Sequence, residues 1–211
     1  MPEPRPAALP PGERTVGQLV AESIRFYGDH FWVVLPLGLP LAVVDLINIG
    51  HRTAFQVAVL WLAAPLFCAA YLRASQLVLE VRPTRAAAIV ALLVFLPFPA
   101  LVLVYILPGI AWFGLLGLAV PAAMAESLGV RDGLRRGLQL SRAELVHAIG
   151  GITTFSLVYL VSKGALLVLL HTQGSQTERI AVGLADVVLS PLIFLGAVFL
   201  YVDQAVRAKV K

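Results

Sequence analysis

Residues 144–170 read ELVHAIGGITTFSLVYLVSKGALLVLL, and this stretch decides the fold class. After its first residue it contains one charged side chain, Lys163, in a run rich in Leu, Val, Ile and Ala. About 20 apolar residues in helical form are enough to cross the hydrocarbon core of a bilayer. The apolar residues do not alternate with polar ones as in a half-buried strand, so the stretch predicts a transmembrane helix.

Similar apolar stretches occupy most of the chain. Of the 211 residues, 59% are hydrophobic and 13% are charged, and the mean hydropathy is +0.88. A soluble domain has about 25% charged residues. Because lipid offers no hydrogen-bond partners to the backbone, such spans must be helices or a closed barrel, and continuous apolar runs indicate helices. The sequence therefore predicts an all-α polytopic membrane helix bundle with six transmembrane helices, at about residues 31–49, 54–78, 86–106, 109–127, 144–170 and 181–203.

Residues 1–14 contain five prolines and no apolar run, and we expect them to be a disordered cytoplasmic tail. Residues 15–211 then form a single six-helix transmembrane domain. So few residues lie outside the spans that we expect no soluble catalytic domain.

Basic residues are distributed unequally between the two sides of the predicted bundle. Arg52 and Arg179 lie on one side, and Lys163 lies within a span. The other 13 of the 16 basic residues lie on the side of both termini: Arg5, Arg14, Arg25, Arg73, Arg82, Arg85, Arg131, Arg135, Arg136, Arg142, Arg207, Lys209 and Lys211. Because cytoplasmic loops are enriched in Lys and Arg, we expect cytoplasmic N- and C-termini. The preference for Arg, with abundant Ala, Leu and Val, is typical of GC-rich bacteria, which favours the bacterial cytoplasmic (inner) membrane.

Two segments outside the spans have the pattern of amphipathic helices. Residues 15–29 place apolar side chains on one face, and Thr15 with Gln18 has the form of a capping box. Residues 129–142 combine a stripe of Val and Leu with a neighbouring face of arginines. We expect both helices to lie in the cytoplasmic interface. The arginines expected to meet anionic lipid headgroups are Arg131, Arg135 and Arg142.

Three stretches carry a resemblance to a known family: GERTVGQLVAESIRFYGDHFWVVLPL (12–37), VPAAMAESLGVRDGLRRGLQLSRAEL (120–145) and FLYVDQAVR (199–207). They resemble uncharacterised bacterial integral membrane proteins related to the glycerophosphoryl diester phosphodiesterase membrane-domain family. The resemblance implies a six-helix integral membrane unit with cytoplasmic termini. The family favours a small hydroxyl residue where this chain has Gly137, and an Arg soon after a Tyr–Asp element that is here spread over Tyr201, Asp203 and Arg207. We do not expect phosphodiesterase activity, which belongs to a separate domain in that family.

Three ionisable residues fall inside the predicted spans: Asp45, Lys163 and Asp186. Charges within a bilayer are rare and are usually paired or functional. At about 1.5 Å rise per residue, they lie about 6, 10 and 8 Å from the outer ends of their spans. We therefore expect an intramembrane polar cluster with Lys163 between the two carboxylates. It can be a salt bridge that fixes helix registry, a water-filled vestibule for an ion or polar solute, or unpaired residues of which one is neutral.

A second set of charges is expected at the cytoplasmic face. Glu126 ends the fourth span and Asp203 ends the sixth, so both can pair with Arg135 and Arg136 of the second amphipathic helix. This inner-face charge cluster either holds that helix in place or binds a lipid headgroup or phosphate.

Catalytic and cofactor motifs are missing from the sequence. The four histidines lack metal-ligand spacing, and there is no G-x-S-x-G, phosphate loop or G-x-G-x-x-G pattern. We therefore expect no catalytic residue, metal or cofactor and no nucleic-acid binding. Our leading interpretation is a non-enzymatic scaffold or accessory membrane subunit, with a second copy or a membrane partner. The alternatives are a small transporter or channel-like protein that uses Asp45, Lys163 and Asp186, and a lipid-handling protein with a lateral groove near Arg135 and Arg136.

Overall fold

In the computed structural model, which describes residues 10–104, 106–172 and 174–210, every regular element is a helix. The all-α prediction is confirmed for this part of the chain, and residues 1–9 of the predicted tail lie outside it. In chain order the helices are α1 (Val16–Asp29), α2 (Phe31–Val34), the 3-10 turn η1 (Leu35–Gly38), α3 (Leu39–Asn48), α4 (Thr53–Leu79), α5 (Arg85–Phe95), α6 (Phe98–Val104), α7 (Ile106–Leu116), α8 (Ala119–Ala125), α9 (Val130–Ala143), α10 (Leu145–Leu170), α11 (Ser175–Leu189) and α12 (Pro191–Val210).

Among the residues that the structure describes, five helical stretches are long and apolar enough to cross a membrane. Many of their large side chains are exposed, and Leu62 and Val146 are 81% and 88% exposed. A surface of this kind suits lipid rather than water. The five stretches correspond to the first, second, fourth, fifth and sixth predicted spans: Phe31–Asn48, Thr53–Leu79, Leu107–Ala125, Leu145–Leu170 and Gln176–Lys209.

The third predicted span, residues 86–106, is not one long helix. Its apolar part is the shorter stretch Arg85–Leu101, and within this stretch the helix is interrupted between α5 and α6. Pro97 lies at this interruption. Proline has no backbone N–H to donate and its ring obstructs the preceding turn, so it interrupts the helix. The described residues therefore support five full-length spans and one short, broken helix.

Aromatic side chains satisfy the backbone at these breaks. Trp61 on α4 and Trp112 on α7 donate hydrogen bonds of 2.9 and 2.8 Å to carbonyl oxygens around the end of α5, just before Pro97. The Tyr71 hydroxyl on α4 donates across 2.8 Å to the carbonyl of Gly117, where α7 gives way to α8. In a lipid environment no water would replace these donors, so the aromatic residues stabilise the broken helices.

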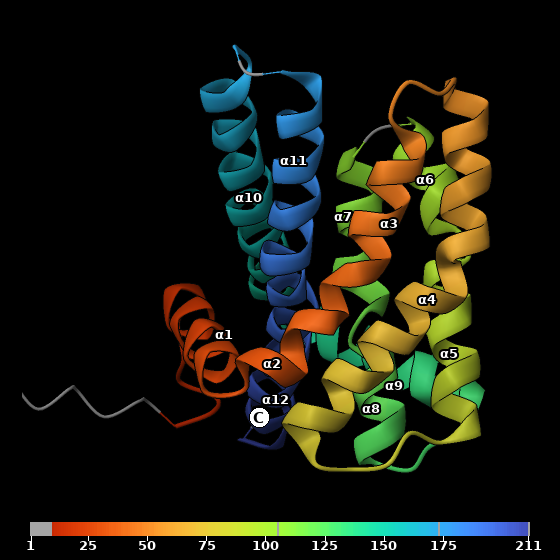
Figure 1. Ribbon diagram of the computed structural model, residues 1–211. Helices are drawn as coiled ribbons and strands as arrows, with labels where there is room; N and C mark the ends of the chain where they lie inside the picture. Colours follow the sequence, from red (N-terminus) through yellow and green to blue (C-terminus); the bar gives the residue numbers. More distant parts are fainter. Residues whose placement is uncertain (1–9, 105, 173, 211) are drawn as a thin grey trace, which may run out of the picture.

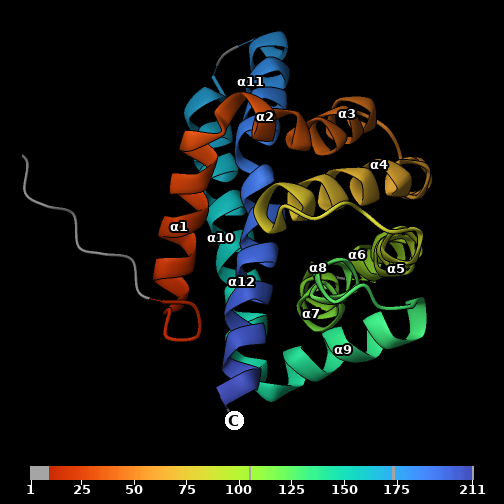
Figure 2. The ribbon, with the colours of Figure 1, turned by 90° about the horizontal axis from the view of Figure 1, so that it is seen from below.

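Six helices surround the centre of the molecule. Going round, α3 contacts α4, α4 contacts α6, α6 contacts α7, α7 contacts α10, α10 contacts α11, and α11 contacts α3 (Figure 1). The end of the bundle that is lower in Figure 1 carries α1, α8, α9 and the end of α12. Seen from below, α9 lies across this end of the bundle from α12 towards α5 (Figure 2).

Helix α1 begins as the sequence predicts. Thr15 and Gln18 form the capping box, in which each side chain binds the other's backbone N–H. The residues just before it, assigned by the sequence to a disordered tail, are instead held against α12. The N–H of Gly12 donates to Asp203 over 2.7 Å, and Arg207 donates to the carbonyl of Arg14 over 2.7 Å.

Helix α9 packs through small residues rather than through its leucine stripe alone. Gly133 and Gly137 are buried and face α8, and a Cβ on Gly137 would overlap the backbone of Ala119. Small residues spaced by four let two helix backbones approach closely. This contact gives a structural reason for glycine at position 137.

Candidate functional site

The Lys163 cluster consists of Asp45, Tyr159, Lys163 and Asp186, and it joins three helices. Lys163 on α10 forms ion pairs with Asp45 on α3 and, over 2.8 Å, with Asp186 on α11. The three charges predicted as an intramembrane cluster are therefore brought together, with the ammonium group between the carboxylates. The side chains of Lys163 and Asp45 are 15% and 32% exposed, whereas that of Asp186 is fully buried.

Local backbone geometry brings α3 and α11 together. Gly38, which ends η1, lies so close to Val187 that a Cβ would overlap the oxygen of its backbone. The next helix, α3, starts directly afterwards and presents Asp45 to Asp186 and Lys163. A side chain at position 38 would push the two helices apart, so glycine at this position is part of how the cluster is assembled.

Tyr159 is a member of the cluster that the sequence analysis missed. Its hydroxyl donates to Asp186 Oδ1 over 2.5 Å and accepts a hydrogen bond of 3.0 Å from the Lys163 ammonium. The other carboxylate oxygen of Asp186 is buried without a hydrogen-bond partner. A signal was present in the sequence, because residues four apart, such as Tyr159 and Lys163, share a helix face.

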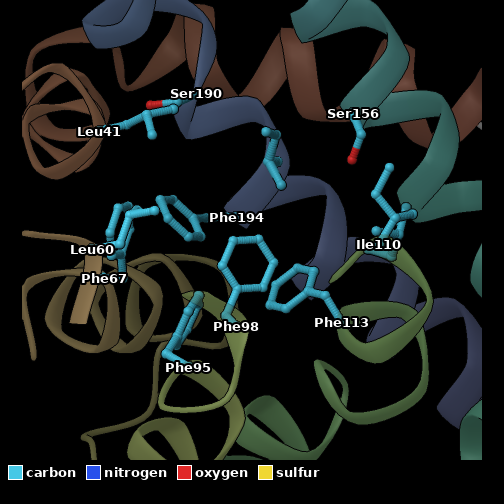
Figure 3. Close-up of a pocket in the computed structure, with 12 residues that line it drawn as sticks. Leu41, Leu60, Phe67, Phe95, Phe98, Ile110, Phe113, Ser156, Ser190 and Phe194 are labelled. Carbon is cyan, nitrogen blue, oxygen red and sulfur yellow. The ribbon is translucent and has the colours of Figure 1, made fainter. Parts of the chain in front are cut away.

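A cavity of about 140 Å³ lies next to the Lys163 cluster, and we call it the phenylalanine chamber. Figure 3 shows the rings of Phe98, Phe113 and Phe194 turned towards it, and the hydroxyl of Ser156 directed to the same side. Its principal lining residues are Phe67, Phe95, Phe98, Phe113, Phe194 and the two serines, Ser156 and Ser190. The lining thus combines aromatic rings from five helices with two hydroxyl groups.

The chamber and the cluster occupy successive turns of the same helices. Asp45 follows the lining residue Leu41 by four positions, and Asp186 precedes Ser190 by four. Residues four apart lie on one helix face, about one 5.4 Å turn from each other. The Lys163 cluster therefore lies about one helical turn from the chamber on both α3 and α11.

The predicted inner-face charge cluster is divided in two. Glu126 accepts hydrogen bonds of 3.0 and 3.1 Å from the Nε of Arg136 and one of 3.4 Å from Tyr201. Arg135 takes no part in this contact and lies in a groove described below. Asp203 belongs to a separate set of residues.

Asp203 pairs with its own helix rather than with the arginines of α9. Arg207, four residues on, donates over 2.7 Å to Asp203 Oδ2 and over 2.9 Å to Glu144. His147 Nε2 lies 3.2 Å from the same carboxylate oxygen, without the alignment of a hydrogen bond. With the Gly12 contact, these residues tie the start of α10 and the chain before α1 to α12. The sequence analysis missed Arg207 as the partner, although its i, i+4 spacing from Asp203 is a standard pairing distance.

A surface groove lies between α7 and α9. Its walls combine the leucines Leu116, Leu134 and Leu138 with two exposed arginines, Arg131 and Arg135, and one carboxylate, Asp132. The third predicted headgroup contact, Arg142, is also exposed but does not line this groove. Apolar walls beside cationic groups can hold the interfacial part of an anionic amphiphile.

Among the described residues, no group of three or more His, Cys, Asp or Glu is arranged so that it could hold a metal ion. No family model, curated protein or solved structure matches the chain. The family resemblance of the three sequence stretches therefore stays a prediction.

Proposed function

We propose that this chain is a six-span protein of the bacterial inner membrane, with both termini in the cytoplasm. Helix α5 then crosses together with α6, and α1 and α9 lie in the cytoplasmic interface. The charge distribution supports this orientation, because Arg131, Arg135 and Arg142 are exposed at the end that carries α9. The membrane-domain family that the sequence resembles has the same topology.

Within that membrane, we propose a non-enzymatic scaffold or accessory subunit. The observation that carries this proposal is the closure of the Lys163 cluster, in which a single ammonium group is held between two carboxylates. Buried ion pairs of this kind fix the registry of the elements they join. Here the ion pairs join α3 to the consecutive helices α10 and α11, which lie much later in the chain. A rigid bundle suits a protein whose task is to hold a partner rather than to move a solute.

The main alternative is a transporter that opens the Lys163 cluster during its cycle. Purified protein in liposomes distinguishes the two, with lumenal pH and sodium dyes as readouts and Lys163→Met as the matched variant. We expect fluxes equal to those of protein-free liposomes for both proteins. A wild-type flux that Lys163→Met abolishes would replace the scaffold proposal with the transporter.

A scaffold also requires a partner in its own membrane. Extraction in native lipid discs, followed by native mass spectrometry of the protein released from its lipid, should give a protein complex heavier than the 22.6 kDa chain with a fixed stoichiometry. The extra mass is a second copy or another membrane protein. Particles that contain only one chain would contradict the proposal.

We further propose that the α7–α9 groove holds anionic lipid headgroups through Arg131 and Arg135. The exposed guanidinium groups beside leucines support this assignment. Such a site anchors the scaffold. It also bears on the lipid-handling alternative, which requires a lateral groove near Arg135 and Arg136; Arg135 lines this groove, whereas Arg136 pairs with Glu126.

A further inference from the structure

The phenylalanine chamber differs from an ordinary packing defect in its size and lining. Its volume of about 140 Å³ is close to that of an engineered apolar cavity of about 150 Å³ that stays dry and binds benzene. Most gaps in a well-packed interior are smaller than a water molecule. A space of this size therefore fits one six-membered ring.

The chamber is suited to aromatic molecules in particular. Phe95 contacts the rings of Phe67, Phe98, Phe113 and Phe194 at centroid distances of 5.7 to 6.5 Å. These stacked, tilted and edge-on contacts are the arrangements that aromatic pairs prefer. A further ring would find both faces and edges to pack against. An ion in the same place would be poorly solvated, so the occupant has to be neutral.

One buried hydroxyl in the lining is without a partner. Ser190 is 2% exposed, lines the chamber, and its Oγ makes no hydrogen bond. In the same bundle, the hydroxyls of Ser23, Thr153 and Thr154 each donate to the carbonyl four residues earlier. Ser190 does not use this bond, so its hydroxyl can bind a group inside the chamber.

Water fits this space poorly. A buried water typically makes about three hydrogen bonds, whereas the chamber offers at most the two hydroxyls of Ser190 and Ser156 in a lining that is otherwise apolar. An aromatic ring that carries one oxygen satisfies both parts of the site at once. The ring packs among the phenylalanines and the oxygen meets Ser190.

We propose that the phenylalanine chamber is a binding site for a neutral aromatic molecule of the phenol class, held by ring packing and by a hydrogen bond to Ser190. The proposal does not depend on the scaffold function, because it concerns binding at a different group of residues. The Lys163 cluster lies one helical turn from the chamber on α3 and α11, so a bound ring would lie next to the charged groups of Asp45, Lys163 and Asp186.

The test uses 4-fluorophenol and fluorobenzene as probes of purified full-length protein in detergent, followed by fluorine NMR. Protein-free micelles give the background of partition into detergent. We expect a saturable bound signal for both probes, with tighter binding of 4-fluorophenol. Absence of a saturable signal above the micelle background would overturn the proposal.

Variants assign the signal to the chamber. Ser190→Ala should weaken 4-fluorophenol about fivefold, as expected for one neutral hydrogen bond of about 1 kcal/mol, and leave fluorobenzene unchanged. Ser75→Ala is the matched control, because Ser75 is equally buried and without a partner but does not line the chamber. Ser156→Leu fills the chamber and should abolish binding of both probes.

Two outcomes of the variant series would refute the proposal. Equal weakening by Ser190→Ala and Ser75→Ala would mean a general effect on the fold rather than a contact with the probe. Full binding of both probes to Ser156→Leu would place them elsewhere, for example on the lipid-facing surface. Thermal unfolding of each variant shows separately whether it has kept its fold.

Discussion

Replacing Lys163 by methionine should destabilise the protein more than any other single change in the Lys163 cluster. The variant keeps the length of the side chain but leaves Asp186, whose side chain is fully buried, without its cation. Removing one partner of a buried pair costs about 3–5 kcal/mol. Because Lys163 and Asp45 are 15% and 32% exposed, we expect the lower end, about 3 kcal/mol.

The assay is thermal unfolding in detergent, followed by intrinsic tryptophan fluorescence. For a chain of this size, about 3 kcal/mol corresponds to a fall in Tm of about 6–12 °C. Asp45→Asn should cost only about 1 kcal/mol, because this carboxylate is partly exposed and Lys163 keeps Asp186 as a partner. The double variant Lys163→Met with Asp186→Asn should recover most of the loss, because the fully buried charge is gone and the remaining carboxylate, Asp45, is partly exposed.

The double variant is the decisive control. If the buried charge is the cause, removing both charges restores stability, whereas simple loss of packing would add the two effects. A Tm of Lys163→Met within about 1 °C of the wild type would refute the reasoning, because it would mean that the ammonium group contributes nothing to holding α3, α10 and α11 together.

Three further predictions concern other contacts. Gly137→Ala should displace α9, because its Cβ overlaps the backbone of α8, and limited proteolysis should then cut the helix faster; Gly150→Ala, with open space around it, should not. Tyr71→Phe leaves a buried carbonyl unpaired at the α7–α8 break and should cost about 1–3 kcal/mol in thermal unfolding. Replacing Arg131 and Arg135 together by glutamine should reduce retention of anionic lipid in native mass spectrometry without changing neutral lipid. The matched control for this double variant replaces Arg52 and Arg179, at the other end of the bundle, by glutamine, and it should leave the retention of anionic lipid unchanged.

The three charges inside the spans could be found from the sequence because their depth is simple arithmetic. Each is a rare residue type in an apolar run, and the length of the run sets its distance from the end of the helix. Their pairing followed once all three were expected at similar depth. Tyr159 was missed because a tyrosine in an apolar span is common, and only its contact with Asp186 distinguishes it.

The charges at the opposite end were harder to predict. The sequence places Asp203, Arg135, Arg136 and Glu126 at the same face of the bundle, so depth alone does not choose between partners. In the structure Asp203 pairs with Arg207 on its own helix, whereas Glu126 takes Arg136. The choice depends on which way each helix is rotated about its axis. Helix rotation follows from the packing of many side chains, and it is not a property of any short stretch.

Apolar length, charge distribution and the position of prolines are local properties, and they were enough to define the helical fold class, the start of α1 and the presence of charges within the spans. The tryptophan donors at the Pro97 break, the close approach of Gly137 to α8 and the phenylalanine chamber depend on contacts between different helices. A cavity in particular has no sequence pattern of its own, because it is the space that side chains from several helices leave unfilled. That space, and the unpartnered hydroxyl of Ser190 beside it, exist only once the helices have packed.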